Sequence, residues 1–276
     1  MRKLSLLTLL LLAPAAAFAA TPECKHSQPR NLTLDLAGVK AVVFDIAAND
    51  LAVDAVPGAK PALGGQACAS DEKYLQQLKL TQHKAGDKLY VTARREGSSV
   101  GIFMSSNYAY LKLAATLPDN VMVQLKVGSG DAVVTGAPLL SADVGSGDVE
   151  ARHIRGLVAA AVGSGDITLE DIGSLHVISV GSGDLSARKV RGPAKIGSVG
   201  SGDFELDGAS GDVEIGSVGS GDARVTGVSG SVKVDSVGSG DVEVDDIRGD
   251  LSVASKSSGS VSHNRVDGRV NVPSDN

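Results

Sequence analysis

The stretch VGSGDVEVD, residues 237–245, contains the pattern that decides the fold. Its first five residues, Val-Gly-Ser-Gly-Asp, occur seven times, beginning at Val127, Val144, Val162, Val180, Val199, Val218 and Val237. Successive copies are 17 to 19 residues apart, and a degraded eighth copy, residues 256–260, follows 19 residues after the last one. Repetition at a fixed interval of this size indicates one supersecondary unit per copy, stacked into a solenoid.

The residues between these strings alternate as β-strands do. In residues 241–245 the valines fall on one side and the acidic residues on the other. A second set of glycines trails the first by eight or nine residues, and consists of Gly156, Gly173, Gly192, Gly211, Gly230, Gly249 and Gly268. Each copy therefore reads as strand, glycine corner, strand, glycine corner, with one apolar face on each strand.

A coil of this kind cannot bury its apolar face alone, but stacked coils share a continuous core. The sequence predicts an all-β fold, a β-solenoid of about eight two-strand coils of 17–19 residues. At the usual strand spacing, the stack would be roughly 35–40 Å tall. We expect glycine at both corners because positive φ is cheap without a Cβ, and because stacked corners leave no room for side chains.

The preceding section, residues 20–126, lacks the repeat but has strand-like patterning. The expected strands, each bounded by turn-forming residues, are 40–47, 51–56, 75–82, 88–94, 108–114 and 121–127. We expect this β-rich section to cap the solenoid and shield its first edge. The predicted organisation is a signal peptide at 1–19, the β-rich section at 20–126, and the VGSGD-repeat solenoid with a terminal capping coil at 127–276, one continuous fold being as plausible as two domains.

The first twenty residues predict export. Arg2 and Lys3 precede an apolar run, and Ala17-Phe18-Ala19 has the small-x-small pattern of a signal-peptidase site. The run is too short to span a bilayer, and no later segment of the sequence is long and apolar enough to do so. We therefore expect an exported protein without a transmembrane segment after signal removal, located in the periplasm, on the outer surface or in the medium.

Charge is distributed unevenly along the exported chain. Residues 20–126 carry 12 basic and 10 acidic side chains, and residues 127–276 carry 12 basic and 22 acidic ones. The second half is therefore predicted to repel nucleic acid and anionic lipid, and nucleic-acid binding is excluded.

The chain has two cysteines, Cys24 and Cys68. In an oxidising compartment the default expectation is one disulfide, worth roughly 4 kcal/mol in the chain-entropy model for a loop of this length. A metal or redox role is disfavoured because there is no CxxC motif and no histidine at ligand spacing.

These residues resemble a known family. The alternating strands with glycine-serine-glycine-aspartate corners are similar to the bacterial putative-adhesin β-strand-repeat proteins, which have toast-rack or head-GIN domains. The lead-in from residues 111–113 through Pro118 to residues 121–123 fits the same family, and the resemblance covers roughly residues 40–272. It implies an exported β-solenoid with no established enzymatic site, and it does not include the cysteine pair.

One aspartate per coil is the sharpest candidate functional feature. The residues are Asp131, Asp148, Asp166, Asp184, Asp203, Asp222 and Asp241. Stacked in register, their carboxylates would lie about 5 Å apart and repel by about 1 kcal/mol per neighbouring pair in water. Two explanations stay open: each carboxylate accepts hydrogen bonds from backbone N–H groups of its own corner, or cations, Ca²⁺ above all, bridge successive coils.

The sequence favours a non-enzymatic protein with no cofactor other than this possible Ca²⁺. A serine also recurs in each corner, but no histidine repeats beside it and no GxSxG motif occurs. A polysaccharide-active β-helix enzyme is the weakest alternative, because from Val127 onward Phe204 is the single aromatic residue. We expect an adhesin-like scaffold or interaction protein of the bacterial envelope, whose partner is an unidentified protein or glycan; the sequence does not indicate an oligomeric state.

Overall fold

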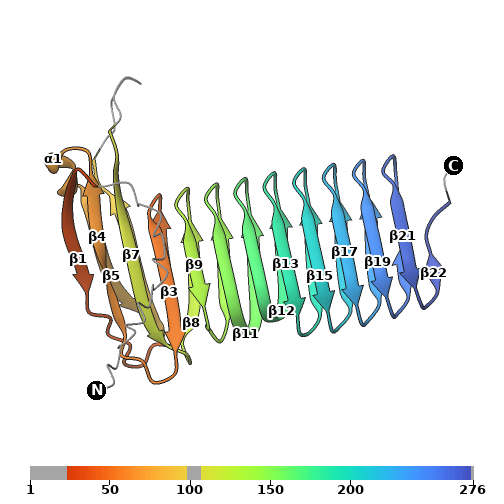
Figure 1. The fold of residues 1–276 in the computed structure, drawn as a ribbon, viewed down its shortest axis with the longest axis horizontal. Helices are drawn as coiled ribbons and strands as arrows, with labels where there is room; N and C mark the ends of the chain where they lie inside the picture. The colour runs from red at the N-terminus through yellow and green to blue at the C-terminus, as the bar shows by residue number, and fades with distance from the viewer. Residues whose placement is uncertain (1–23, 98–106, 275–276) are drawn as a thin grey trace, which may run out of the picture.

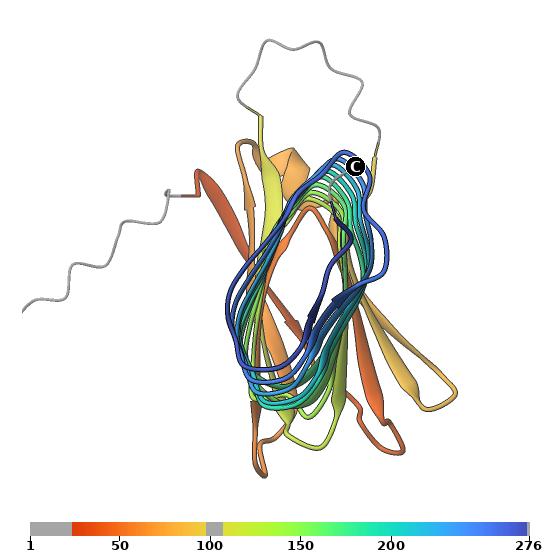
Figure 2. The same cartoon turned by 90° about the vertical axis from the view of Figure 1, so that its right-hand side faces the viewer.

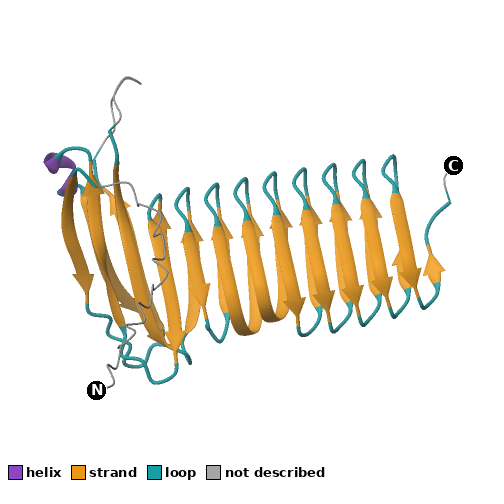
Figure 3. Ribbon diagram, viewed as in Figure 1, coloured by secondary structure: helices purple, strands orange, loops and turns teal. Residues whose placement is uncertain are grey.

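The computed structural model describes residues 24–97 and 107–274, and almost all of its regular structure is β-strand. The strands form two facing sheets that run along the long axis of the molecule (Figures 1 and 3). Viewed along this axis, the coils superimpose as flattened rings (Figure 2). The predicted all-β solenoid is confirmed.

The strands follow the repeat. The solenoid contains β8 (Met122–Val127), β9 (Ala132–Thr135), β10 (Leu140–Val144), β11 (Val149–Val162), β12 (Ile167–Val180), β13 (Leu185–Val190), β14 (Ala194–Val199), β15 (Phe204–Ala209), β16 (Val213–Val218), β17 (Ala223–Val228), β18 (Val232–Val237), β19 (Val242–Ile247), β20 (Leu251–Val253), β21 (Val261–Val266) and β22 (Val270–Asn271). From β8 to β21 they form eight coils, because β11 and β12 each pass from one sheet into the other through the second corner.

Successive coils stack in parallel and in register. Val199 pairs with Val218, and Val218 with Val237, so each residue type lies on its counterpart one coil away. Side chains that point inward, such as Val225, Val244 and Ile247, are at most 1% exposed. Columns of identical apolar residues therefore form one continuous core between the two sheets.

In one sheet, the strands β11, β12, β13, β15, β17, β19 and β21 each contain an extra outward residue before an inward one. This extra residue has positive φ in every case: His153, Asp171, Lys189, Gly208, Gly227, Asp246 and Arg265. Such a β-bulge bends the strand toward the second corner. The sequence analysis did not predict it.

Glycine is required at the first corner for space, and positive φ is not involved. A Cβ on Gly202 would lie 1.9 Å from the carbonyl oxygen of Gly183 in the preceding coil, and one on Gly221 would lie 1.9 Å from that of Gly202. The glycines of the two repeated corners do not have positive φ. The expectation of positive φ was wrong, and the expectation of crowding between stacked corners is confirmed.

The N-terminal section forms a cap of mixed strands around the first coil. Its elements are β1 (His26–Leu32), β2 (Ala41–Ala47), β3 (Asp50–Val56), β4 (Ala62–Ala69), α1 (Glu72–Leu75), β5 (Leu78–Ala85), β6 (Lys88–Arg95) and β7 (Ala109–Pro118). β2 and β3 already stack in parallel on β8 and β9, so the coil geometry begins before the first VGSGD string. Beyond them the cap adds β6 and β5 to one sheet and β7, β4 and β1 to the other, with antiparallel pairs β5–β6, β4–β7 and β1–β4.

Most of the strands expected in this section are present, with one correction. A strand was predicted for residues 75–82, but Leu75 ends the short helix α1 and β5 begins at Leu78. Asp71 caps that helix, because its carboxylate accepts a hydrogen bond from the N–H of Lys73. Strands β1 and β4 were not predicted.

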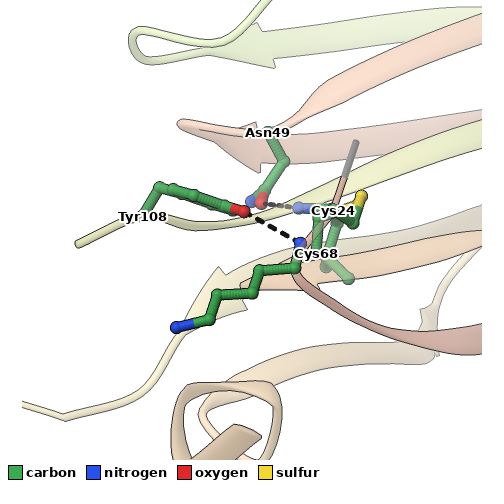
Figure 4. The surroundings of a disulfide bond; sticks show 6 residues. Cys24, Asn49, Cys68 and Tyr108 are labelled. Carbon is green, nitrogen blue, oxygen red and sulfur yellow. Dashed lines mark hydrogen bonds between the residues drawn. A yellow bond between two sulfur atoms is a disulfide. The ribbon is translucent and has the colours of Figure 1, made fainter. Parts of the chain in front are cut away.

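Two one-off features hold the cap together (Figure 4). A disulfide joins Cys24 to Cys68, with 5.2 Å between their Cα atoms, and so ties the start of β1 to β4. Asn49, only 3% exposed, donates from Nδ2 to the carbonyl oxygens of Ile46 and Ala93, and its Oδ1 accepts from the N–H of Leu111. These contacts connect the corner after β2 to both outer strands, β6 and β7.

The opposite end of the solenoid is open. Within the described residues, β21 pairs with β19 and β22 with β20, no strand lies beyond them, and Val270 is 42% exposed. His263 stands in register with the buried Val244, so a polar residue takes the place of a core valine in the last coil. A polar residue in an inward position discourages further strand pairing at an edge.

In the described part of the chain, no helix is long and apolar enough to cross a membrane. The expected signal peptide, residues 1–19, lies outside the described residues and stays a prediction.

Candidate functional site

The seven predicted aspartates lie in one column along the edge of the first corner. Each directly precedes the strand that follows its glycine corner, and each side chain is exposed while the glycine before it is buried. The stacking of the coils thus brings the predicted site residues together in a single row.

Each carboxylate bonds to the next coil. Oδ1 of Asp131 accepts the N–H of Asp148 at 3.2 Å, and Oδ1 of Asp203 accepts the N–H of Asp222 at 2.9 Å. The same bond recurs through Asp148, Asp166, Asp184 and Asp222, and at the end Asp241 accepts the N–H of Ser260. The sequence analysis expected a donor in the carboxylate's own corner, and this was wrong: the donor belongs to the following coil. Each aspartate therefore helps to bind one coil to the next.

An eighth aspartate extends this column into the cap. Asp50 begins β3, and its carboxylate accepts a hydrogen bond from the N–H of Asp131. Partial burial raises the pKa of Asp50, and the hydrogen bond opposes this rise. Sequence reasoning missed Asp50 because its corner, residues 47–50, has no glycine; the signal was an Asn-Asp pair directly after a predicted strand.

The end of the column has a different partner. The hydroxyl of Ser260 donates to Oδ1 of Asp241 at 2.8 Å, in addition to the backbone N–H. These two hydrogen bonds, the hydroxyl first, lower the pKa of the Asp241 carboxyl. Ser260 stands where the repeat would place an eighth VGSGD aspartate, so the column ends in a residue that donates to the last carboxylate.

The second corner carries a shorter ladder that the sequence analysis did not identify. Oδ1 of Asp212 accepts the N–H of Ser231, Oγ of Ser231 accepts the N–H of Asp250, and Oδ1 of Asp250 accepts the N–H of Arg269. The bonds to Arg269, from its N–H first, lower the pKa of Asp250. A short polar side chain that accepts the next coil's N–H is therefore a device used at both corners.

A shallow, open hollow runs beside the aspartate column. Near the C-terminal end it has a volume of about 670 Å³ and lies between Asp203, Asp222 and Asp241 on one side and outward residues of β15, β17, β19 and β21 on the other. Among the latter, Arg224 contacts Glu243 at 2.5 Å. A second hollow of about 470 Å³ lies beside Asp131, Asp148 and Asp166. The solenoid therefore presents an acidic surface on which carboxylates recur once per coil.

The predicted calcium role is not resolved by this geometry. In the described residues, no group of three or more His, Cys, Asp or Glu side chains is placed to hold a metal ion. Ca²⁺ in proteins takes six to eight oxygen ligands, usually from several side chains and carbonyls. The cation interpretation of the seven aspartates stays a prediction.

The corner serines are exposed, and their backbones take part in stacking. The N–H of Ser201, for example, donates to the carbonyl oxygen of Gly181 at 2.8 Å. Two of the histidines are engaged elsewhere: Nδ1 of His153 lies 2.8 Å from Oδ2 of Asp171, and the ring of His83 stacks on Tyr90. These contacts place the two histidines away from the serine row.

Known proteins share this architecture. Residues 66–276 match the model of the family described as Toastrack DUF4097. The crystal structure of a "putative adhesin" from Parabacteroides merdae matches with a TM-score of 0.58 and 13% identity, covering 87% of this chain and 97% of that one. That of a "putative lipid binding protein" from Parabacteroides distasonis matches with a TM-score of 0.54 and 18% identity, over the same shares of the two chains. Among curated proteins, no match was found.

Proposed function

Because the chain belongs to the Toastrack DUF4097 family, we propose that it is an exported, non-enzymatic interaction protein of the bacterial cell envelope. The observation that carries the proposal is the uniformity of the stacked columns. Seven aspartates and seven serines recur in one corner geometry, with one hydrogen-bond pattern from coil to coil. Acid–base catalysis needs two groups with different environments, whereas a lattice of equal groups suits a binding surface.

Export is supported by two features. The N-terminal residues have the pattern of a secretory signal, and Cys24 and Cys68 form a disulfide, as expected in an oxidising compartment. The adhesin-like role is supported by the fold shared with the Parabacteroides merdae protein, although at 13% identity this likeness concerns architecture alone.

The test is crosslinking in intact cells that express the full chain. A photoreactive residue replaces Glu205 on the aspartate side or Lys195 on the opposite sheet, both of which point outward. We expect processing near Ala19, recovery with the envelope or medium, and a discrete crosslinked product from at least one of the two positions. An unprocessed chain in the cytoplasm would contradict export. Turnover of a polysaccharide by the purified protein, abolished by a single substitution in the aspartate column, would contradict a non-enzymatic role.

A further inference from the structure

The two outer faces of the solenoid differ in charge. One face begins with the aspartate column and also carries Glu150, Glu205 and Glu243; we call it the aspartate face. On the opposite sheet, outward lysines are balanced by acids: Lys195 lies 3.8 Å from Glu214, and Lys233 lies 2.8 Å from Asp235. The acidic excess of residues 127–276 is therefore concentrated on the aspartate face. The net charge counted over all of residues 127–276 does not describe the opposite sheet.

The cap end of that opposite sheet is basic. On β5 and β6, Lys79 stands directly across from Arg94, and like charges in this position repel. Asp45 offsets one of them, because its carboxylate lies 2.6 Å from Arg94. Nζ of Lys88 contacts the neutral amide oxygen of Gln124 at 3.1 Å, and this contact does not neutralise the positive charge of Lys88.

Acidic residues also stand on this part of the sheet. Lys126 on β8 pairs in register with Asp45 on one side and Asp143 on the other. The four cations named on these strands thus exceed the two acids, which leaves a net charge of +2. An exposed surface of this sign would attract an anionic partner.

Exposed aliphatic side chains lie farther along the same sheet. Leu139, Leu157 and Ile178 are 41%, 40% and 59% exposed, and they belong to the second, third and fourth coils. Leu139 and Leu157 are neighbours, because the residues that follow them, Leu140 and Val158, pair directly. Half of the exposed large hydrophobic residues of the described chain lie here.

One of the cations, Lys88, shares a line across the strands with Leu139, whereas Lys79 and Arg94 lie at the other end of β5 and β6. In register, Lys88 pairs with Ala41 and Ala41 with Met122, and Leu139 comes next on the neighbouring strand. Tyr90, one step along β6, stacks on His83 at 4.9 Å between ring centroids. Tyrosine is favoured where an apolar phase meets water.

We propose that this basic and aliphatic surface, the cap-end face, docks on an anionic lipid bilayer. The proposal rests on the envelope role proposed above and names the partner. A bilayer offers both phosphate groups for Lys79, Lys88 and Arg94 and an apolar boundary for Leu157 and Ile178. An acidic polysaccharide would offer negative charges to these cations but no apolar phase for the aliphatic side chains.

The acidic face does not prevent this docking. The two sheets are about 10 Å apart, and with side chains the aspartate face lies about 20 Å from the bilayer, roughly two Debye lengths at physiological salt. Repulsion from that face is therefore largely screened, and it orients the solenoid with its aspartates away from the lipid. The acidic excess of residues 127–276 predicted that this half repels anionic lipid, and that prediction applies to the aspartate face.

The experiment is flotation of the oxidised, signal-free chain with vesicles. Vesicles of phosphatidylcholine containing about one-third phosphatidylglycerol should carry the protein upward, whereas phosphatidylcholine alone should not. Removing two positive charges with Lys79→Gln and Lys88→Gln should weaken partitioning about 25-fold, since each cation near an anionic surface contributes about fivefold. The double substitution Leu157→Ser and Ile178→Ser should also weaken it, with no change in charge.

A matched control removes the same charge farther along the same sheet. Lys195→Gln with Lys233→Gln should change partitioning by less than about twofold, because both lysines are paired with acids. Thermal unfolding of each variant separates a lost surface from a lost fold. Equal losses in the two lysine pairs, unchanged binding in the serine variant, or retention on an acidic polysaccharide but not on vesicles would each overturn the proposal.

The two proposals fail separately. If the chain is exported and crosslinks in the envelope but does not bind anionic vesicles, the lipid partner is wrong and the envelope role stands. If the chain stays unprocessed in the cytoplasm, the envelope role is wrong whatever the vesicles show.

Discussion

The stacked coils and the N-terminal cap contain the same kind of strand but are stabilised in different ways. In the coils, each contact is made between counterparts, such as Val218 on Val199 or the Asp222 N–H on Asp203. In the cap, the decisive contacts occur once: the three hydrogen bonds of Asn49 and the Cys24–Cys68 disulfide. A residue of the coils is thus constrained by its column, and a residue of the cap by its individual partners.

The ends of the molecule show the same contrast. A repeat specifies how one coil covers the next but does not specify how the stack begins or ends. The cap covers the first coil with added strands, whereas in the last coil an exposed, polar His263 stands in register with the buried Val244. Substitutions in the two regions should therefore differ in size and in kind.

The largest effect is expected for a Cβ at the crowded corner. Gly202→Ala would place a methyl group 1.9 Å from the carbonyl oxygen of Gly183, so the coils must separate locally. We expect a loss of about 3 kcal/mol in the free energy of unfolding, at the upper end for overpacking. Urea denaturation measures it.

The control lies one residue away. Ser201→Ala changes an exposed side chain in the same corner and should cost less than about 0.5 kcal/mol. If Gly202→Ala is as mild as this control, the corners are not closely stacked and the distinction between column and cap does not hold.

A smaller effect is expected for Asn49, the one buried polar residue among the described residues of the cap. Asn49→Ala leaves the N–H of Leu111 and the carbonyls of Ile46 and Ala93 without their side-chain partner, in a place that is 3% exposed. The expected loss is about 2 kcal/mol, and hydrogen exchange should increase first in β6 and β7. Asn264→Ala, which removes a bond from an exposed asparagine to Asp245, is the matched control and should be nearly neutral. Uniform loss of protection along the whole stack would contradict a local role for Asn49.

The sequence predicted the solenoid well because its signal is repeated. The alternation of valine and polar residues at a fixed interval determines which side chains are inward, and the register determines that the seven aspartates form a column. What it could not supply was the donor for each carboxylate, because a hydrogen bond to the next coil depends on the rise between coils. The positive-φ residues were also missed, since Lys189, Gly208 and Asp246 share no residue type.

Prediction was weaker in the cap for a related reason. β1 contains Pro29 and little apolar sequence, and it is held at an edge by β4 and by the disulfide. β4, with two glycines and several alanines, has no strong strand propensity. Both strands form because of tertiary contacts that no local pattern records.

The acid dependence of the aspartate column gives a finer test of stacking. Hydrogen bonds from Ser260 lower the pKa of Asp241 below its ordinary value of 3.8. Its contribution to stability is therefore complete above that value and disappears as the pH falls through the lower pKa of the folded state. Asp241→Asn should be slightly less stable than the wild type near pH 7, and the difference should disappear as the pH falls through the lowered pKa of the folded state. A difference that persists at the lower pH would mean that the carboxylate does not act through its charge.

The smallest effect is expected from calcium, and it decides between the two explanations of the aspartate column. Oδ1 of each of the seven aspartates already accepts an N–H from the following coil, so the carboxylates have an internal counterpart for part of their charge. We therefore expect the thermal midpoint to be the same in EGTA and in millimolar Ca²⁺. If Ca²⁺ instead raises the midpoint, and Asp184→Asn in the middle of the column removes that rise while Asp54→Asn on β3 does not, cations bridge the coils. In that case Ca²⁺ would hold successive coils together in addition to the hydrogen bonds between them. The coils would then differ from the cap by containing a row of metal sites along the solenoid.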